Sequence, residues 1–221
     1  MRLKVLLQRL RSLFSQIRIL LKPLDERNVH SDPIKQFQRW FDEAVKAKLF
    51  MPEAMTLATA TKDGKPSARM VLLKQVDEKG FVFFGNYNSR KGKELASNSH
   101  AALVFYWSEL LRQVRIEGSV EQISTEESDQ YFQTRPRDSQ ISAHASPQSE
   151  VVSSRAELER LFKEAEQRYG NQSVPRPAYW GGYRLKPDRI EFWQSREARL
   201  HDRVVYVLQN DGSWKINRRA P

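Results

Sequence analysis

Hydrophobic side chains change their spacing near residue 52. From residue 33 to about residue 49 they recur every three or four positions, as one face of an α-helix requires. Asp32-Pro33 supplies a capping carboxylate followed by proline in the first helical turn. The sequence therefore predicts a helix over residues 33–49, with an apolar face made of Ile34, Phe37, Trp40, Phe41, Ala44 and Val45.

After Pro52 the chain becomes rich in β-branched and aromatic residues, with turn-forming sequences such as Asp63-Gly64 between the apolar runs. Short connections between strands are typical of an antiparallel meander or barrel. We predict strands over residues 54–61, 67–75, 80–84, 101–107 and 112–123.

The second half of the chain mixes helices with further strands. Capping residues and apolar spacing predict helices over 88–97, 125–134 and 153–169. Strands are predicted over 179–185, 189–194 and 202–208, with a short one near 214–216. We expect a β-rich α+β fold, a single β-barrel of mainly antiparallel strands with peripheral helices.

The net charge of +10 comes mostly from the first 22 residues, which carry six basic residues and no acid. The rest of the chain has 31 basic and 27 acidic residues, so we expect no nucleic-acid partner. Residues 1–24 form a basic amphipathic segment, suited to an anionic membrane, an organelle presequence or packing on the protein itself. We favour packing on the protein, and assign residues 25–221 to the main domain.

The chain has no cysteine, which excludes disulfides, thiolate nucleophiles and cysteine-ligated metal centres. This composition suits a reducing cytoplasm, where we expect the protein to reside. The four histidines lack metal-ligand spacing, so no metal site is expected. Glycine-rich phosphate loops and dinucleotide-binding motifs are also missing from the sequence, which argues against an NTPase or a Rossmann enzyme.

Three groups of basic residues are suited to anionic ligands. Residues 69–74 form an apolar strand with a cation at each end, and residues 135–140 follow Tyr131 at a helix end. Asn88-Ser89-Arg90-Lys91 places two cations at a helix start, where acids are normally preferred; a bound phosphate would offset that mismatch. The alternative in each case is a set of charges that simply reach solvent or stabilise a helix end.

A fourth basic group, Arg199, His201 and Arg203, follows an aromatic run. If the segment is extended, these side chains share one face and form a cationic row. The alternative is a charged edge strand that limits aggregation. Several anion sites without a thiol, a metal site or a nucleotide loop are typical of a phosphorylated cofactor acting on a phosphorylated substrate.

In order and spacing, these motifs resemble the pyridoxine (pyridoxamine) 5′-phosphate oxidase family over about residues 24–221. The matching segments are Arg69-x-Val71-Leu72-Leu73-Lys74, Ser89-Arg90-Lys91, Arg135-Pro136-Arg137-Asp138-Ser139-Gln140, Gln148-Ser149, Trp180-Gly181-Gly182, Glu191-Phe192-Trp193-Gln194, Arg199-Leu200-His201-Asp202-Arg203 and the ending Asn217-Arg218-Arg219-Ala220-Pro221.

The resemblance implies a split β-barrel homodimer with FMN at the subunit interface. Such an enzyme oxidises pyridoxamine or pyridoxine 5′-phosphate to pyridoxal 5′-phosphate in vitamin B6 biosynthesis and salvage, and reduces O2 to H2O2. Arg199 and His201 are the implied catalytic residues, with His201 a candidate base. The implied FMN-binding residues are Arg69, Met70, Val71, Leu72, Leu73, Lys74, Phe84, Gly85, Arg90, Lys91, Gln113, Gln148, Ser149, Trp193 and Arg203. The implied substrate-binding residues are Lys74, Tyr131, Arg135, Ser139, Arg199, Leu200 and His201.

Two positions depart from the family pattern. The family's amino-terminal Arg-x-x-Tyr segment is Gln16-Ile17-Arg18-Ile19 here, and Ser195 stands where the family has glycine. If that position needs a positive φ, serine would cost about 1 kcal/mol and shift Arg199. These departures motivate one alternative, a non-catalytic carrier of FMN or pyridoxal phosphate. Another is a flavin reductase of the same fold acting on another substrate.

Overall fold

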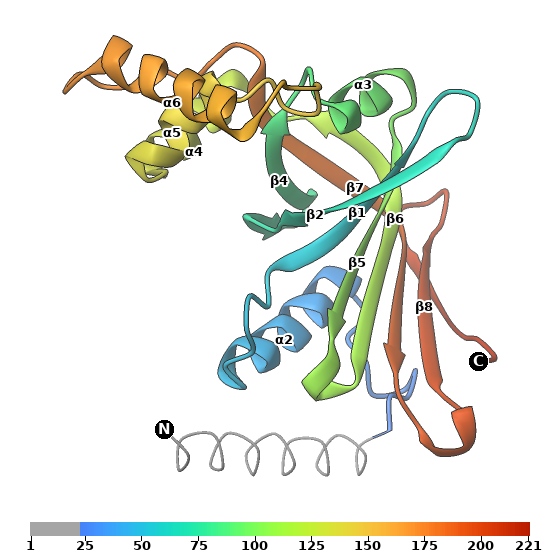
Figure 1. Cartoon of the computed structure of the whole chain (residues 1–221). Coiled ribbons are helices and arrows are strands. Elements are labelled where there is room, and N and C mark those ends of the chain that lie inside the picture. Colours follow the sequence, from blue (N-terminus) through green and yellow to red (C-terminus); the bar gives the residue numbers. More distant parts are fainter. Residues whose placement is uncertain (1–22) are drawn as a thin grey trace, which may run out of the picture.

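The computed structural model describes residues 23–221, which form one curled antiparallel sheet with helices at its two ends (Figure 1). The sheet order in this part of the chain is β2-β1-β5-β6-β7-β4-β3, and β8 joins β7 to β9. The strands are β1 (Ala54–Ala60), β2 (Pro66–Leu72), β3 (Gln75–Asp77), β4 (Gly80–Asn86), β5 (His100–Trp107), β6 (Arg112–Gln122), β7 (Trp180–Gln194), β8 (Asp202–Leu208) and β9 (Trp214–Arg218).

The four helices predicted within residues 23–221 are all present, and one further helix in this part of the chain was not predicted. Asp32 caps the first by accepting from the Ile34 amide at 2.8 Å, and the helix ends at Lys46, three residues earlier than predicted. Ser124 caps the 125–134 helix in a reciprocal box with Glu127. The helices are α2 (Pro33–Lys46), α3 (Arg90–Ser97), α4 (Thr125–Thr134), α5 (Arg137–Ala145) and α6 (Arg155–Tyr169).

Every pairing in the described sheet is antiparallel, as predicted, and the strands follow the barrel alternative and not a simple meander. β1 lies between β2 and β5, and β4 pairs with β7, so that Phe84 faces Gly182. Turn signals in a sequence predict neighbouring hairpins only. The long-range pairings depend on the length of β7, which pairs with β6 along 183–194 and with β4 along 180–185.

The two strands predicted over 179–185 and 189–194 are one continuous strand, β7. Pro187 does not end it, because it lies at a bulge of β7: Glu117 pairs with Arg189 and Gly118 with Pro187, which leaves Asp188 as the extra residue. A Cβ atom on Gly118 would come within 2.0 Å of the Lys186 carbonyl oxygen. Glycine at this point lets the backbones approach closely enough for β7 to continue.

Two apolar clusters stabilise the described domain. Helix α2 packs on the sheet, with the Phe37 ring 4.9 Å from that of Phe81 and the Trp40 ring 5.2 Å from that of Phe192. A second cluster joins α4, α5 and α6 around Trp180, at the other end of the sheet (Figure 1).

Helix α5 lacks the sequence signals of a helix start, which explains why it was not predicted: its first flanking residue, Pro136, makes no side-chain capping bond. None of the helices within residues 23–221 is both long and apolar enough to span a bilayer. The segment predicted over residues 1–24 and the Gln16–Ile19 departure fall almost entirely on residues 1–22, outside the described part of the chain.

Candidate functional site

The predicted site residues form two groups at opposite ends of β7. The first, here called the α3–α5 cluster, contains Arg69, Phe84, Gly85, Arg90, Lys91, Tyr131, Arg135, Ser139 and Gln148. The second, the β7–β8 cluster, contains Gln113, Trp193, Arg199, Leu200, His201 and Arg203. Trp180 and Trp193 mark the two ends of β7. At about 3.3 Å per residue they are roughly 40 Å apart along the strand.

The start of α3 carries the predicted pair of cations. Ser89 caps the helix, accepting from the Gly92 amide at 3.4 Å, and the first turn holds no acid. The amide groups and the partial positive charge of a helix start favour an anion. This arrangement confirms the predicted helix start and leaves Arg90 and Lys91 where a phosphate would be stabilised.

Lys91 is a buried cation, 8% exposed, that makes no ion pair with an acid among the described residues. Its ammonium group donates to Ser89 Oγ at 3.2 Å and to Gln148 Oε1 at 2.5 Å. Burial, and then the charge of Arg69, lower the pKa of Lys91 to about 8. A Cβ atom on Gly85 would lie 2.6 Å from Lys91 Cε, so glycine there leaves room for the lysine stem.

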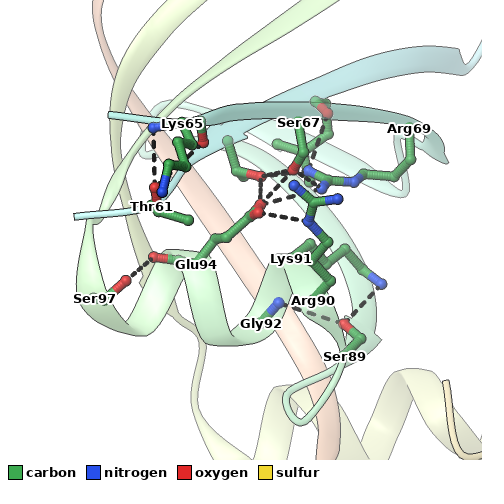
Figure 2. A network of polar contacts seen from close by, with 12 residues as sticks. Thr61, Lys65, Ser67, Arg69, Ser89, Arg90, Lys91, Gly92, Glu94 and Ser97 are labelled. Atoms are coloured by element: carbon green, nitrogen blue, oxygen red, sulfur yellow. Dashed lines mark hydrogen bonds and ion pairs between the residues drawn. The ribbon is translucent and has the colours of Figure 1, made fainter. Parts of the chain in front are cut away.

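Glu94 forms ion pairs with two further cations of this cluster, Arg69 and Arg90 (Figure 2). Its carboxylate accepts from Arg90 Nε at 2.9 Å and from Arg69 Nη2 at 3.2 Å. Thr59 and Ser67 donate their hydroxyl groups to the same carboxylate. Burial acts to raise the pKa of Glu94, but the four donors outweigh it and lower the pKa to about 2.

Arg135 lies between two aromatic rings at the junction of α4 and α5. Its guanidinium carbon is 4.4 Å from the Trp180 ring centroid and 5.4 Å from that of Phe132. Its Nη1 is buried and has no hydrogen-bond partner in the described residues. Burial lowers the pKa of Arg135, with Tyr131 opposing that shift. A buried guanidinium nitrogen without an acceptor is costly, and an anionic ligand would satisfy it.

An aromatic stack connects Arg135 to the α3 region. The Tyr131 ring stacks on Phe84 at 3.8 Å, and Phe84 stacks on Trp180 at 5.4 Å. Phe84 and Gly85 are neighbours in β4, so consecutive residues of one strand lie beside the two buried cations, Phe84 through Tyr131 and Trp180 on the Arg135 side and Gly85 at Lys91. Lys91 and Arg135 are therefore the two candidate anion sites of the α3–α5 cluster.

In the β7–β8 cluster, the rings of Trp193 and His201 lie 4.8 Å apart. The Arg196 amide donates to His201 Nδ1 at 3.0 Å. In the neutral imidazole this bond places the proton on Nε2, so His201 presents an N–H donor. Gln113 pairs with Trp193 across β6 and β7, which adds a polar side chain at the same end of the sheet.

The predicted extended row of Arg199, His201 and Arg203 is wrong. Glu197–Arg199 is a single 3-10 turn, and strand β8 starts only at Asp202. Ala198 and Arg199 both have positive φ, 51° and 59°. The turn breaks the alternation of an extended chain, so only Arg203 belongs to the sheet.

Arg203 is held in place by a buried acid. Its Nε and Nη2 both contact Glu191 at 2.9 Å, and Arg115 contacts the same carboxylate at 3.1 Å. Hydrogen bonding to Glu191 raises the pKa of Arg203. Arg203 Nη1 donates to the Ala220 carbonyl, so the end of the chain folds back against β8.

Ser195 does not have the positive φ that would strain serine. Its amide donates to the Leu111 carbonyl at 2.9 Å, and the left-handed conformations occur at Ala198 and Arg199 instead. The expected backbone cost of replacing glycine at this position therefore does not arise in this structure.

Five of the remaining predicted residues lie in or directly after β2, and the sixth, Ser149, follows α5. Met70 is 63% exposed on β2, whereas Leu73 is buried in the core. Lys74 is exposed between β2 and β3, and its amide donates to the Val82 carbonyl. Ser149 is exposed, with a φ of 76°. Val71 and Leu72 are partly buried. Their assignment to FMN stays a prediction.

Sequence reasoning missed the residues that hold the cations in place. Glu94 was detectable, since it stands four residues after Arg90 and therefore on the same helix face. Glu191 belongs to one of the matching motifs but was given no role. Thr59 and Ser67 gave no signal, because only the pairing of β1 with β2 brings their side chains together.

The chain matches two family descriptions. Residues 41–169 match "Pyridoxamine 5′-phosphate oxidase", and residues 180–221 match "Pyridoxine 5′-phosphate oxidase C-terminal dimerisation region". A Trichormus variabilis protein named pyridoxine/pyridoxamine 5′-phosphate oxidase is 57% identical, over 91% of this chain and 94% of its own. A Burkholderia vietnamiensis protein of the same name is 58% identical over 90% and 93%.

Solved structures agree on the fold. PhzG from Burkholderia lata, crystallised with tetrahydrophenazine-1-carboxylic acid, has a TM-score of 0.84 and 32% identity, covering 90% of this chain and 98% of its own. An FMN-binding protein from Nostoc punctiforme has a TM-score of 0.70 at 14% identity, covering 87% and 100%. The curled half-barrel with peripheral helices is thus the expected split-barrel fold, and the chain belongs to the pyridoxamine 5′-phosphate oxidase family.

Proposed function

We propose that this protein is an FMN-dependent oxidase that converts pyridoxamine or pyridoxine 5′-phosphate to pyridoxal 5′-phosphate. The observation that carries the proposal is the pair of anion sites in the α3–α5 cluster. Lys91 is buried without an acid, and Arg135 has a buried nitrogen without an acceptor within residues 23–221. Two phosphates, one from a cofactor and one from a substrate, match two such sites.

FMN fits the residues at the start of α3. Its phosphate would be held by Arg69, Arg90 and Lys91, with Gln148 placed beside Lys91 by their hydrogen bond. When bound, FMN supplies the acceptor for the hydride that leaves the substrate, and O2 then reoxidises it with release of H2O2.

The substrate phosphate fits the Arg135 region. Arg135, Tyr131 and Ser139 come from adjacent parts of α4 and α5, and Lys74 would reach them from β2–β3. The aromatic stack fixes Tyr131, so little rotamer freedom is lost when a phosphate binds. Binding the phosphate remotely orients the carbon that is oxidised.

A complete site requires residues from two copies of the chain. The β7–β8 cluster is roughly 40 Å from Trp180 along β7, whereas ligand pockets of about 300–1,000 Å³ are only on the order of 10 Å across. The match of residues 180–221 to a dimerisation region supports a homodimer. We propose that Gln113, Trp193, Arg199, Leu200, His201 and Arg203 of one protomer complete the site formed by the α3–α5 cluster of its partner.

In this arrangement His201 acts as a hydrogen-bond donor. Its Nδ1 already accepts from the Arg196 amide, so in the neutral imidazole Nε2 carries the proton and would donate to a bound ligand. This hydrogen bond argues against a role for His201 as the base. Arg199 supplies a fixed charge from an exposed turn, and a water molecule or the substrate amine takes up the proton.

The similarity to PhzG supports a second candidate, oxidation of a tricyclic carboxylic acid. The two 57–58% identical relatives favour the phosphorylated vitamin substrate over it. A non-catalytic carrier or a flavin reductase of the same fold would each give a different response of the bound flavin to the substrate.

The test is an anaerobic titration of the purified flavin-loaded protein with pyridoxamine 5′-phosphate, followed by flavin absorbance. The oxidase predicts bleaching, return of colour in air and formation of pyridoxal 5′-phosphate. An unchanged flavin band at saturating substrate contradicts it. Bleaching by tetrahydrophenazine-1-carboxylic acid alone would instead assign the PhzG-like activity, and binding of pyridoxal phosphate without turnover would assign a carrier.

A further inference from the structure

Glu94 lies at the centre of the cations assigned to the FMN phosphate, although no prediction gave it a role. It stands in the second turn of α3 and is 4% exposed. We propose that Glu94 is a positioning residue that holds Arg69 and Arg90 in one fixed arrangement and thereby sets the affinity of the site for the flavin phosphate. This inference rests on the proposed function.

The contacts of Glu94 use both of its oxygens and join three elements (Figure 2). Oε1 accepts from Arg90 Nε at 2.9 Å, within α3. Oε2 accepts from Thr59 of β1 at 2.5 Å, and from Ser67 and Arg69 of β2 at 2.6 and 3.2 Å. One carboxylate therefore fixes the position of β2 relative to the start of α3.

Arg69 is held on several sides, whereas Arg90 depends on Glu94. Arg69 also donates to the Leu57 carbonyl at 3.3 Å, to Thr59 Oγ1 at 2.5 Å and to Ser67 Oγ. Arg90 is 61% exposed, and Glu94 is its one hydrogen-bond partner within residues 23–221. Without the carboxylate, Arg90 would sample many rotamers in solvent, and Arg69 would lose the acid that holds it.

The charges of the group match a phosphate monoester. Arg69, Arg90 and Lys91 carry three positive charges and Glu94 one negative charge, which leaves a net charge of two. A phosphate monoester carries about −1.5 to −2 at neutral pH. Glu94 thus prevents an excess of positive charge in the ligand-free protein while leaving enough to bind the dianion.

Charge and position make opposite predictions for the replacement of Glu94 by glutamine. If charge alone mattered, removing a negative charge would strengthen phosphate binding. If position matters more, binding weakens, because two arginines must be ordered and brought together against their mutual repulsion. We expect position to dominate, since glutamine cannot accept charge-assisted bonds from both arginines.

The experiment compares the affinities of the flavin-free wild-type protein and Glu94→Gln for FMN and for riboflavin, by quenching of flavin fluorescence. Riboflavin lacks the phosphate, so the ratio of the two dissociation constants isolates the phosphate contribution. We expect Glu94→Gln to weaken FMN binding about tenfold, or about 1.4 kcal/mol, and riboflavin binding less than about twofold. Glu159→Gln, which removes an equal charge from an exposed ion pair with Arg155 on α6, is the matched control and should change neither.

Tighter or unchanged FMN binding by Glu94→Gln would overturn the inference, as would an equal loss for FMN and riboflavin. If this variant fails to fold, Ser67→Ala tests the same network without a charge change and should weaken FMN binding about threefold, with riboflavin unchanged. Unchanged FMN binding by Ser67→Ala would then count against the network. A wild-type protein that binds no FMN would refute the proposed function as well; binding by the wild type without an effect of either variant refutes only the role of Glu94.

Discussion

Replacing Arg135 by leucine should separate substrate binding from stability. In the ligand-free protein the buried Nη1 has no acceptor among the described residues, which costs about 1–3 kcal/mol. The two aromatic contacts of the guanidinium stabilise the folded protein by about 0.5–1 kcal/mol each. These contributions nearly cancel, so Arg135→Leu should change the free energy of unfolding by less than about 1 kcal/mol.

Catalysis should respond far more strongly than stability. A hydrogen bond to a charged group is worth about 1.5–3 kcal/mol, so kcat/KM for pyridoxamine 5′-phosphate should fall about 10- to 150-fold. Pyridoxamine, which lacks the phosphate, should show the same low rate with the variant as with the wild type. The assays are urea unfolding and steady-state oxidation of both substrates.

Arg137→Leu is the matched control, because it removes the same charge two residues away. The Arg137 guanidinium donates to the Gln172 and Gly170 carbonyls at the surface. This control should lose about 1 kcal/mol of stability and keep its kcat/KM. If Arg135→Leu lowers kcat/KM equally for pyridoxamine 5′-phosphate and for pyridoxamine, the assignment of Arg135 to the substrate phosphate is refuted. A stability loss above about 3 kcal/mol would refute it as well.

Three further predictions concern charge and packing. The pKa of Lys91 is about 8 in the free protein, and a bound phosphate would raise it. The dissociation constant of FMN should therefore rise up to about tenfold per pH unit above about pH 8. Lys91→Gln should abolish that slope, and a wild-type dissociation constant that does not change with pH would contradict the prediction. The pKa of Glu94 falls from 4.5 to about 2 on folding, so the stability that its charge contributes should be complete above about pH 5 and disappear toward pH 2. The free energies of unfolding of the wild type and Glu94→Gln, measured in urea, should therefore converge at low pH. A difference that stays constant with pH would count against the network. Gly118→Ala should lose about 2–3 kcal/mol of unfolding free energy, because its Cβ would meet the Lys186 carbonyl oxygen. The control Ser119→Ala should stay within about 0.5 kcal/mol of the wild type. Equal free energies of unfolding for the two variants would show that β7 can shift at this point.

The sequence predicted the elements well where local signals exist. Helix 125–134 and strand 202–208 occur within the predicted bounds, because capping residues and alternation are encoded by neighbouring positions. The sheet order was not predictable in this way. The pairing of β4 with β7 joins segments about 100 residues apart, and Pro187 lies at a bulge that no local sequence signal reveals.

In the candidate site too, local sequence signals predicted some features, and others depend on long-range packing. The cations were visible in the sequence because Arg90, Lys91 and Arg135 belong to dense basic motifs. Glu94 was also detectable, four residues after Arg90 on the same helix face. Thr59 and Ser67 were not, since they approach Glu94 only after β1, β2 and α3 pack together. The conformation of residues 197–201 was also missed, because alternation of basic residues predicts a strand while the chain makes a left-handed turn at Ala198 and Arg199.

The central claim, that each site combines the α3–α5 cluster of one protomer with the β7–β8 cluster of its partner, has a direct test in mixed dimers. Arg135→Leu and Arg199→Ala should each have very low activity alone. If the variants are unfolded together and refolded as a 1:1 mixture, about half of the dimers are mixed, and one of the two sites in each mixed dimer carries no substitution. The account predicts recovery of roughly a quarter of the wild-type activity. A mixture no more active than the two variants measured separately, with exchange of subunits verified, would contradict it.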